Sequence, residues 1–240
     1  MRLLLLNPNT TPAVTDLVAA RARSLAGPRA EIVAVTGRFG ARYISSRAAA
    51  AIAGHAALDL LAEHGAGCDA VCLACFGDPG LLALKELSPV PVVGMAEASC
   101  HAAAMVGRRF AIVTGGALWG PMLTEFVASL GLSERLAGIR TVAPTGGEIA
   151  RDPDGALDLL AAACRAAAGE GADVVILGGA ALAGLAGRIA DRVPVPLICS
   201  LQAAVEATLS VARLGVGGSA RRAAAVETVG LSAALSRALA

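Results

Sequence analysis

Two stretches of the sequence, Asp69-Ala-Val-Cys-Leu-Ala-Cys75 and Asp173-Val-Val-Ile-Leu-Gly-Gly179, align with each other without a gap. Each begins with an aspartate, runs through a short apolar segment and ends in small residues. Each is followed by a Pro-Val-Pro element, at Pro89-Val-Pro-Val-Val-Gly94 and Pro194-Val-Pro-Leu-Ile-Cys199. Two linked matches in the same order indicate that the chain contains two similar halves.

Around these stretches, short apolar runs alternate with alanine-rich helical patterns. Such alternation predicts βαβ units and mainly parallel sheets with helices on both faces. We therefore predict an α/β fold with two pseudo-symmetric lobes, residues 1–98 with 208–240 and residues 99–207. The expected strands are residues 2–6, 31–35, 70–74, 90–94, 110–114, 139–142, 174–178 and 195–199. The expected helices are residues 11–25, 47–63, 79–87, 97–105, 120–130, 155–168, 182–190 and a last one from about residue 201.

The repeat also predicts where a ligand binds. Ligands of open parallel sheets bind at the carboxyl ends of the strands, and two facing lobes would place these ends around a common crevice. Cys75 and Gly179 end the two matching stretches, so they are expected at equivalent positions, one from each lobe.

The composition excludes several classes of protein. With 20 Lys+Arg against 19 Asp+Glu, the net charge of +1 argues against nucleic-acid binding, and 56% apolar residues argue against disorder. No uncharged stretch reaches the about 18 to 20 apolar residues of a membrane-spanning helix. We expect a cytoplasmic protein whose six cysteines are reduced thiols.

Polar or glycine-rich segments follow three of the expected strands. Asn7-Pro8-Asn9-Thr10-Thr11 offers amides, hydroxyls and N–H groups to an anion, although a plain helix cap would use the same residues. Thr114-Gly115-Gly116 and Gly178-Gly179-Ala180 could expose backbone N–H groups to a carboxylate or an oxyanion, or form ordinary turns.

Cys75-Phe-Gly-Asp-Pro-Gly80 follows a strand and is expected to open a helix, whose N–H groups would lower the pKa of the Cys75 thiol. Cys72 and Cys75 also form a C-x-x-C spacing. A redox or zinc site is disfavoured, because Cys72 falls inside the strand and no second pair of ligands is present. His55, His64 and His101 fall in expected helices, so we interpret them as structural. Glu97 is a polar candidate at a strand end, with helix capping as its alternative.

Taken together, these segments resemble the aspartate/glutamate racemase superfamily and, within it, the hydantoin racemase branch. The matching motifs span nearly the whole chain in order: Leu6-Asn-Pro-Asn-Thr10, Ala74-Cys-Phe-Gly-Asp-Pro-Gly80, Gly94-Met-Ala-Glu-Ala98, Phe110-Ala-Ile-Val-Thr114 and Val174-Val-Ile-Leu-Gly178. The resemblance implies two α/β lobes and cofactor-independent chemistry at a Cα–H bond. It also implies two cysteines, one from each lobe, that remove the proton and return it on the opposite face.

The sequence departs from this pattern at Gly179. Cys75 fits the first cysteine of the family, but a glycine stands where the resemblance places the second. Three explanations are open. Cys199, at the end of the neighbouring strand, could serve the second face. The chain could instead catalyse one-base chemistry, as in the related arylmalonate decarboxylases, or bind a small carboxylate or ureide without racemase activity.

We therefore predict a racemase or epimerase acting at the acidic Cα–H of a hydantoin, ureide or amino-acid-like substrate. Cys75 would be the general acid/base, and Cys199 a possible second one. No cofactor or metal is expected, the partner is a small molecule, and we expect a homo-oligomer. The expected substrate-binding residues are Asn9, Thr10, Phe76, Thr114, Gly115, Gly179 and Ala180. Backbone N–H groups near Cys75, Thr114 and Gly179 would stabilise the carbanionic oxygen.

Overall fold

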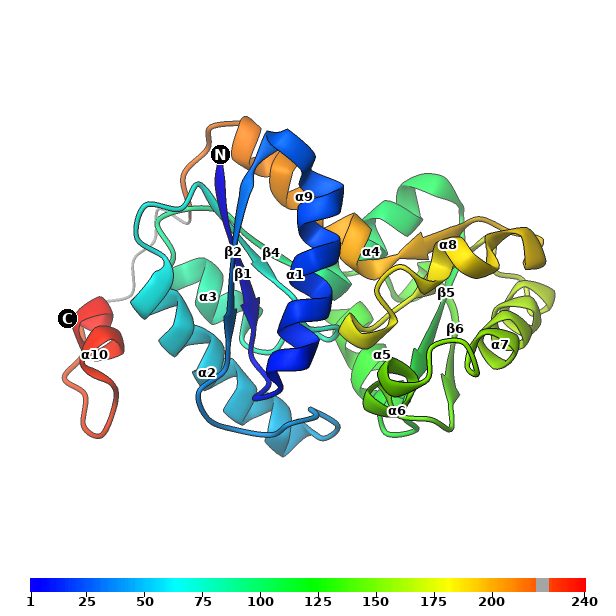
Figure 1. The fold of residues 1–240 in the computed structure, drawn as a ribbon, viewed down its shortest axis with the longest axis horizontal. Helices are drawn as coiled ribbons and strands as arrows, with labels where there is room; N and C mark the ends of the chain where they lie inside the picture. Colours follow the sequence, from blue (N-terminus) through cyan, green and yellow to red (C-terminus); the bar gives the residue numbers. More distant parts are fainter. Residues whose placement is uncertain (219–224) are drawn as a thin grey trace.

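The computed structural model describes residues 1–218 and 225–240 and contains two four-stranded parallel sheets (Figure 1). The first sheet has the order β2-β1-β3-β4 and the second has the order β6-β5-β7-β8, so both lobes share one topology. The strands are β1 (Arg2–Asn7), β2 (Glu31–Thr36), β3 (Ala70–Leu73), β4 (Val92–Gly94), β5 (Phe110–Gly115), β6 (Leu136–Val142), β7 (Val174–Leu177) and β8 (Leu197–Cys199). The predicted fold class, two α/β lobes with parallel sheets, is confirmed.

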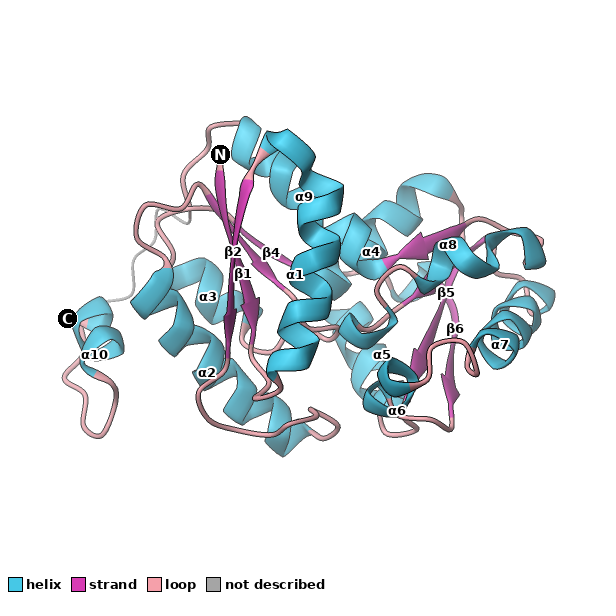
Figure 2. Cartoon of the chain, in the orientation of Figure 1, coloured by secondary structure: helices cyan, strands magenta, loops and turns pink. Residues whose placement is uncertain are grey.

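Helices cover the sheets of both lobes (Figure 2). They are α1 (Pro12–Ala26), α2 (Arg47–His64), α3 (Leu81–Leu87), α4 (Met95–Val106), α5 (Trp119–Ser129), α6 (Gly146–Arg151), α7 (Leu157–Gly169), α8 (Leu185–Ile189), α9 (Ser200–Arg213) and α10 (Ala233–Leu239). Because helices lie on both sides of each sheet, the central strands β3 and β7 are buried along their whole length. No helix in the described residues is both long and apolar enough to cross a membrane.

The two aspartates that begin the repeated stretches make the same contact in each lobe. Asp69 Oδ2 accepts a hydrogen bond from the backbone N–H of Arg2 at 2.7 Å, and Asp173 Oδ2 accepts one from Arg109 at 2.9 Å. Each aspartate thereby fixes the start of an inner strand beside the first strand of its lobe. The repeat in the sequence therefore corresponds to a repeat in strand register.

The Pro-Val-Pro elements set where the strands β4 and β8 begin. We expected strands from residues 90 and 195, but β4 begins at Val92 and β8 at Leu197. Proline has no N–H to donate, so the strand ladder starts only after Pro91 and Pro196. Their carbonyls still accept hydrogen bonds, from Val71 and Val175 respectively.

Two helices were not anticipated from the sequence. The short helix α6 begins at a capping box, in which Glu148 N donates to Thr145 Oγ1 at 3.3 Å and Thr145 N donates to Glu148 Oε2 at 2.7 Å. Thr-x-x-Glu is a readable start signal, but the two glycines inside it weaken the helical pattern. Likewise, α10 is capped by Ser232, which accepts a hydrogen bond from Leu235 N.

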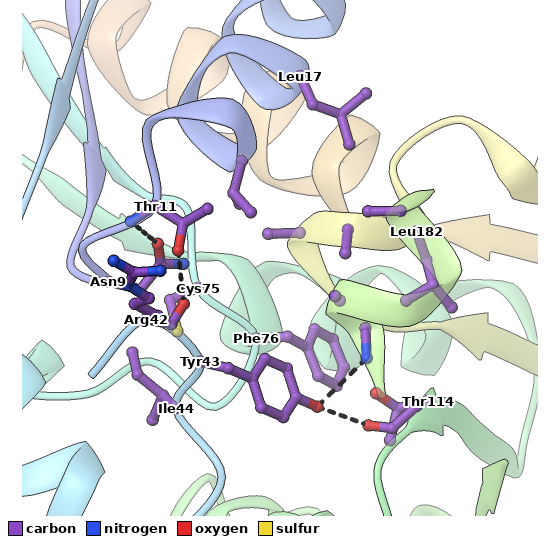
Figure 3. Close-up of a pocket in the computed structure, with 18 of the residues that line it drawn as sticks. Asn9, Thr11, Leu17, Arg42, Tyr43, Ile44, Cys75, Phe76, Thr114 and Leu182 are labelled. Carbon is purple, nitrogen blue, oxygen red and sulfur yellow. Dashed lines mark hydrogen bonds between the residues drawn. The ribbon is translucent and has the colours of Figure 1, made fainter. Parts of the chain in front are cut away.

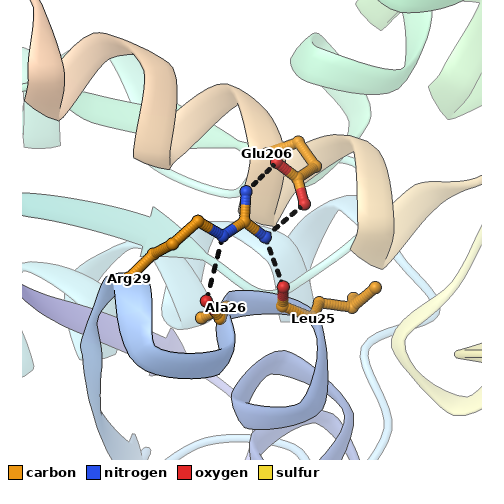
Figure 4. A network of polar contacts seen from close by, with 4 residues as sticks. All are labelled: Leu25, Ala26, Arg29 and Glu206. Atoms are coloured by element: carbon orange, nitrogen blue, oxygen red, sulfur yellow. Dashed lines mark hydrogen bonds and ion pairs between the residues drawn. The ribbon is translucent and has the colours of Figure 1, made fainter.

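The chain crosses between the lobes at α4 and α9. Helix α4 starts at the end of β4 and contacts β7 and β8, whereas α9 starts at the end of β8 and contacts α1, α4 and β3. Arg29 anchors α9 to the first lobe, donating to Glu206 Oε2 at 2.8 Å and to Oε1 at 2.7 Å (Figure 4). The lobe boundaries at residues 98 and 207 fall inside these two helices and stay a prediction.

Candidate active site

A cavity of about 600 Å³ opens between the two lobes (Figure 3). Its lining comes from the carboxyl ends of β1, β3, β5 and β7 and from the loop that follows β2, with further residues from α1, α5 and α6. Most of the lining is apolar, and the polar groups are few. The crevice expected from the strand topology is therefore present.

Cys75 and six of the other candidate residues line this cavity. Those six are Asn9, Phe76, Thr114, Gly115, Gly179 and Ala180. Thr10 is absent from the lining, and Thr11 lines the cavity instead. The backbone N–H of Thr10 donates to Ala41 O at 3.2 Å. Cys199 does not line it either. The Cys199 thiol is buried and accepts a hydrogen bond from Gly184 N at 3.5 Å, so its role as a second acid/base stays a prediction.

Cys75 lies just beyond β3 and is only 7% exposed. Burial raises the pKa of its thiol above the ordinary value, and the nearby Asp78 carboxylate raises it further. The sequence prediction had the opposite direction and was wrong. Helix α3 begins at Leu81 rather than at residue 79, two residues farther along the chain from Cys75 than the sequence predicted.

Asp78 fixes the turn that follows Cys75. Its carboxylate accepts hydrogen bonds from Ala96 N at 3.0 Å and Glu97 N at 2.7 Å, at the start of α4, and burial raises the pKa of Asp78 to about 7. Glu97 caps the same helix by accepting from Gly94 N at 3.3 Å, and it pairs with Lys85. The capping alternative for Glu97 is thus the one observed.

A buried network orients the side chain of Asn9. Its Oδ1 accepts hydrogen bonds from Asn7 Nδ2 at 3.1 Å and from Thr11 N at 2.9 Å. Asn7 in turn donates to Thr15 Oγ1 at 2.8 Å. Because both groups that contact the side-chain amide of Asn9 are hydrogen-bond donors, the atom that they contact must be the amide oxygen. The Nδ2 group makes no hydrogen bond to another described residue.

Aromatic side chains interlock the two lobes beside the cavity. A Cβ atom at Gly178 of the second lobe would collide with the ring of Phe76 from the first. Tyr43, from the first lobe, donates its hydroxyl to Gly115 O at 3.1 Å and accepts a hydrogen bond from Gly146 N at 3.5 Å (Figure 3). Trp119 packs from the second lobe. These are the single tyrosine and single tryptophan of the chain, and this rarity was a signal that the sequence interpretation did not use.

Comparison with known proteins places this arrangement in a family. Residues 3–208 match the profile of the Asp/Glu/hydantoin racemase family. The chain is 36% identical to the hydantoin racemase of Paenarthrobacter aurescens over 90% of this chain and 92% of that one. It is 33% identical to the hydantoin racemase of Pseudomonas sp. (strain NS671), over 90% and 87% of the two chains. The chain belongs to the Asp/Glu/hydantoin racemase family. It is accordingly an isomerase of the racemase type, as the sequence predicted.

Solved structures agree with this assignment. The crystal structure of allantoin racemase from Pseudomonas fluorescens has a TM-score of 0.91 and 31% identity, and the match covers 96% of this chain and all of the other. Arylmalonate decarboxylase shares the fold at a TM-score of 0.63 and 18% identity, covering 92% of this chain and 96% of the other.

The backbone at Gly179, beside the cavity of this racemase, has a conformation that favours glycine. Its φ of +137° is a value that residues with side chains rarely adopt. A Cβ atom there would stand 2.9 Å from Leu182 Cδ1 and 3.8 Å from Thr114 Oγ1. The Gly179 N–H donates to Ser200 Oγ at 3.2 Å, so it is already engaged. The backbone is therefore shaped for glycine, and the predicted donor at Gly179 is occupied.

The histidines lie away from the site of this racemase. His55 and His64 are in α2, where His55 packs against Phe39 with ring centroids 4.9 Å apart, and His101 is in α4. None of them lines the cavity. Over residues 1–218 and 225–240, no group of three or more His, Cys, Asp or Glu side chains is placed to hold a metal ion.

Proposed function

We propose that this racemase acts on cyclic ureides of the hydantoin or allantoin type, with Cys75 exchanging the proton at the acidic Cα. The observation that carries the proposal is that the Cys75 thiol lines an inter-lobe cavity large enough for such a ring. Two relatives that match over 90% of this chain are hydantoin racemases, and a solved relative is an allantoin racemase.

Three polar groups at the cavity are free to hold the ring. Asn9 Nδ2, Thr114 Oγ1 and the backbone N–H of Phe76 make no hydrogen bond to another described residue, and all three residues line the cavity. Removing a Cα proton from a ureide places negative charge on the neighbouring carbonyl oxygen. A donor aimed at such an oxygen stabilises the transition state by roughly 3 kcal/mol.

The proton balance follows from Cys75 and Gly179. The Cys75 thiolate takes the Cα proton and becomes the thiol, while the C–H electron pair moves into the enolate. Return of the proton from Cys75 regenerates the starting enantiomer. Gly179 has no acidic side chain, and a Cβ atom at Gly179 would lie 3.8 Å from Thr114 Oγ1. We therefore infer that the opposite face receives its proton from a water molecule bound by Thr114 Oγ1. The hydroxide that results recovers the proton from the Cys75 thiol.

Hydrogen–deuterium exchange tests this directly. A single enantiomer of 5-benzylhydantoin or of allantoin is incubated with the enzyme in D₂O, with proton NMR and polarimetry as readouts. We expect deuterium at Cα and loss of optical rotation, and we expect Cys75→Ala to abolish both. Cys68→Ala is the matched control, because Cys68 is a buried thiol at the amino end of β3 outside the cavity lining. Exchange that survives Cys75→Ala would contradict the proposal.

The presence of Gly179 also favours a second candidate, decarboxylation of a malonate-type acid. One acid/base residue is sufficient there, because loss of CO₂ creates the carbanion and Cys75 needs only to protonate it. This reaction would release CO₂ from an arylmalonate and give one product enantiomer. Enzyme that releases CO₂ but does not exchange the Cα proton of a ureide would support the decarboxylase instead.

The cytoplasmic location and the homo-oligomeric state expected from the sequence are part of this proposal. Light scattering of the purified chain tests the second: a mass of 23.7 kDa would indicate a monomer and would contradict it.

A further inference from the structure

The cavity carries two arginines and no acidic residue. Arg42, in the loop after β2, lines it from the first lobe, and Arg151, at the end of α6, lines it from the second. No aspartate or glutamate is among the lining residues. In a chain with nearly equal numbers of acidic and basic residues, this is a local excess of positive charge.

Among the described residues, neither guanidinium forms an ion pair. No carboxylate in the described part of the chain lies within 4.0 Å of Arg42 or Arg151. Glu148, on the same helix as Arg151, accepts hydrogen bonds from Thr145 N and Oγ1 instead, and Arg151 Nε donates to Gly147 O at 3.2 Å. Hydrogen bonds from Thr145 lower the pKa of the Glu148 carboxyl, and the charge of Arg151 lowers it further. By contrast, seven other arginines form ion pairs: Arg2, Arg29, Arg38, Arg47, Arg140, Arg188 and Arg192.

The backbone holds Arg42 beside the ring-binding groups. Thr11 Oγ1 donates to Arg42 O at 2.9 Å, and Thr11 N donates to Asn9 Oδ1. In Figure 3, Arg42, Thr11 and Asn9 are grouped near Cys75, with Thr114 and Leu182 on the other side of the cavity. Both arginines are exposed whereas Cys75 is buried, so the positive charges lie at the mouth and the thiol lies deeper.

We propose that Arg42 and Arg151 select a substrate whose Cα substituent ends in a carboxylate. This inference rests on the proposed function. The ring would lie against Cys75, and a short side chain would extend past Leu17 and Ile44, which also line the cavity, toward the two guanidinium groups. Guanidinium groups bind carboxylates with charge-assisted and often bidentate hydrogen bonds. Hydantoins bearing acetate or propionate side chains have this chemistry.

Matched substrates test the inference. The wild-type kcat/KM for racemisation is compared between hydantoin-5-propionate and its neutral amide, hydantoin-5-propionamide, which has nearly the same shape. We expect a preference for the acid of about tenfold or more, as for a hydrogen bond to a charged group. That preference should weaken as salt is added, because salt screens exposed charges.

Variants then assign the preference to these side chains. The double variant Arg42→Gln with Arg151→Gln is expected to lose most of the acid-over-amide ratio, and Arg42→Lys should retain part of it. Arg108→Gln is the control for loss of a charge, because Arg108 lies at the amino end of β5, outside the cavity lining, and this variant should keep the ratio.

The outcomes separate this inference from the proposed function. Equal turnover of acid and amide by the wild type, or an acid preference that survives in the double variant, overturns the inference and leaves the ureide racemase intact. A double variant that loses acid and amide turnover equally also overturns it, because the arginines would then serve the reacting ring. If the wild type racemises neither the acid nor the amide, and no neutral hydantoin either, both proposals are overturned.

Discussion

Trp119 of the second lobe lies directly against Gly77 of the first: a Cβ atom at Gly77 would stand 2.5 Å from the indole Cζ3. In turn, Phe76 of the first lobe lies against Gly178 of the second. Each lobe thus places an aromatic ring onto a glycine of the other. Because Phe76 and Trp119 also line the cavity, these contacts fix its shape as well as the positions of the lobes.

Gly77→Ala is therefore expected to destabilise the fold and to lower racemase activity. Gly77 has a φ of +110°, so the added methyl group meets both the indole ring and an unfavourable backbone conformation. We expect the free energy of unfolding to fall by about 1–3 kcal/mol, as measured by urea denaturation. Gly120→Ala is the control, because that helical glycine has open space around it. It should be neutral or stabilising, and equal losses at both positions would contradict this account.

The repeat and the alternating pattern were sufficient to predict the fold. The two stretches ending at Cys75 and Gly179 are inner strands of equivalent register, so the crevice followed from topology. Most of the candidate site followed as well, because it lies at strand ends. Arg42, Tyr43 and Arg151 did not follow, because they come from a loop and a glycine-rich helix with no periodic signal.

The wrong prediction, that a helix beginning at residue 79 lowers the pKa of the Cys75 thiol, has a local cause. We read Pro79 as the first residue of a helix, but Asp78 and Gly80 both have left-handed backbone angles, with φ of 48° and 78°. The turn therefore continues to Leu81, and Asp78 caps α4 rather than α3. Composition and spacing carry no information about such a choice between two caps.

Cys75 should react slowly with alkylating agents at neutral pH. Because burial raises the pKa of its thiol, the protonated form dominates at pH 7, and only the thiolate reacts rapidly. Alkylation by iodoacetamide, followed at the Cys75 peptide by mass spectrometry, should still be accelerating at pH 9, the ordinary thiol value. The kcat/KM for racemisation should rise over the same range. A plateau near pH 7 in either profile would show a stabilised thiolate instead.

Asp78 should make the stability of the protein depend on pH. Burial raises its pKa from 3.8 to about 7, so between these values the folded state holds a proton that the unfolded state has released. The contribution of Asp78 to stability is therefore complete below pH 4, declines as pH rises to 7, and is constant above it. The slope is at most about 1.4 kcal/mol per pH unit. Urea denaturation of the wild type and of Asp78→Asn between pH 4 and pH 7 should show that only the wild type loses free energy of unfolding in this way. If the free energies of both proteins change with pH in parallel, Asp78 is not the cause.

Gly179→Cys places a thiol at the position that the family resemblance assigns to a second cysteine, yet we expect it to destabilise the protein. The φ of +137° is unfavourable for any side chain, and the new Cβ would press on Leu182 Cδ1 at 2.9 Å. A loss of about 1–3 kcal/mol is typical of such backbone strain. If the contact between the new Cβ and Leu182 Cδ1 contributes, the double variant Gly179→Cys/Leu182→Ala should lose less free energy of unfolding than the two single variants lose together. The shorter side chain at position 182 removes the clash. Strictly additive losses would place the whole cost in the backbone, and a fully stable Gly179→Cys would show that the loop accepts a side chain without strain.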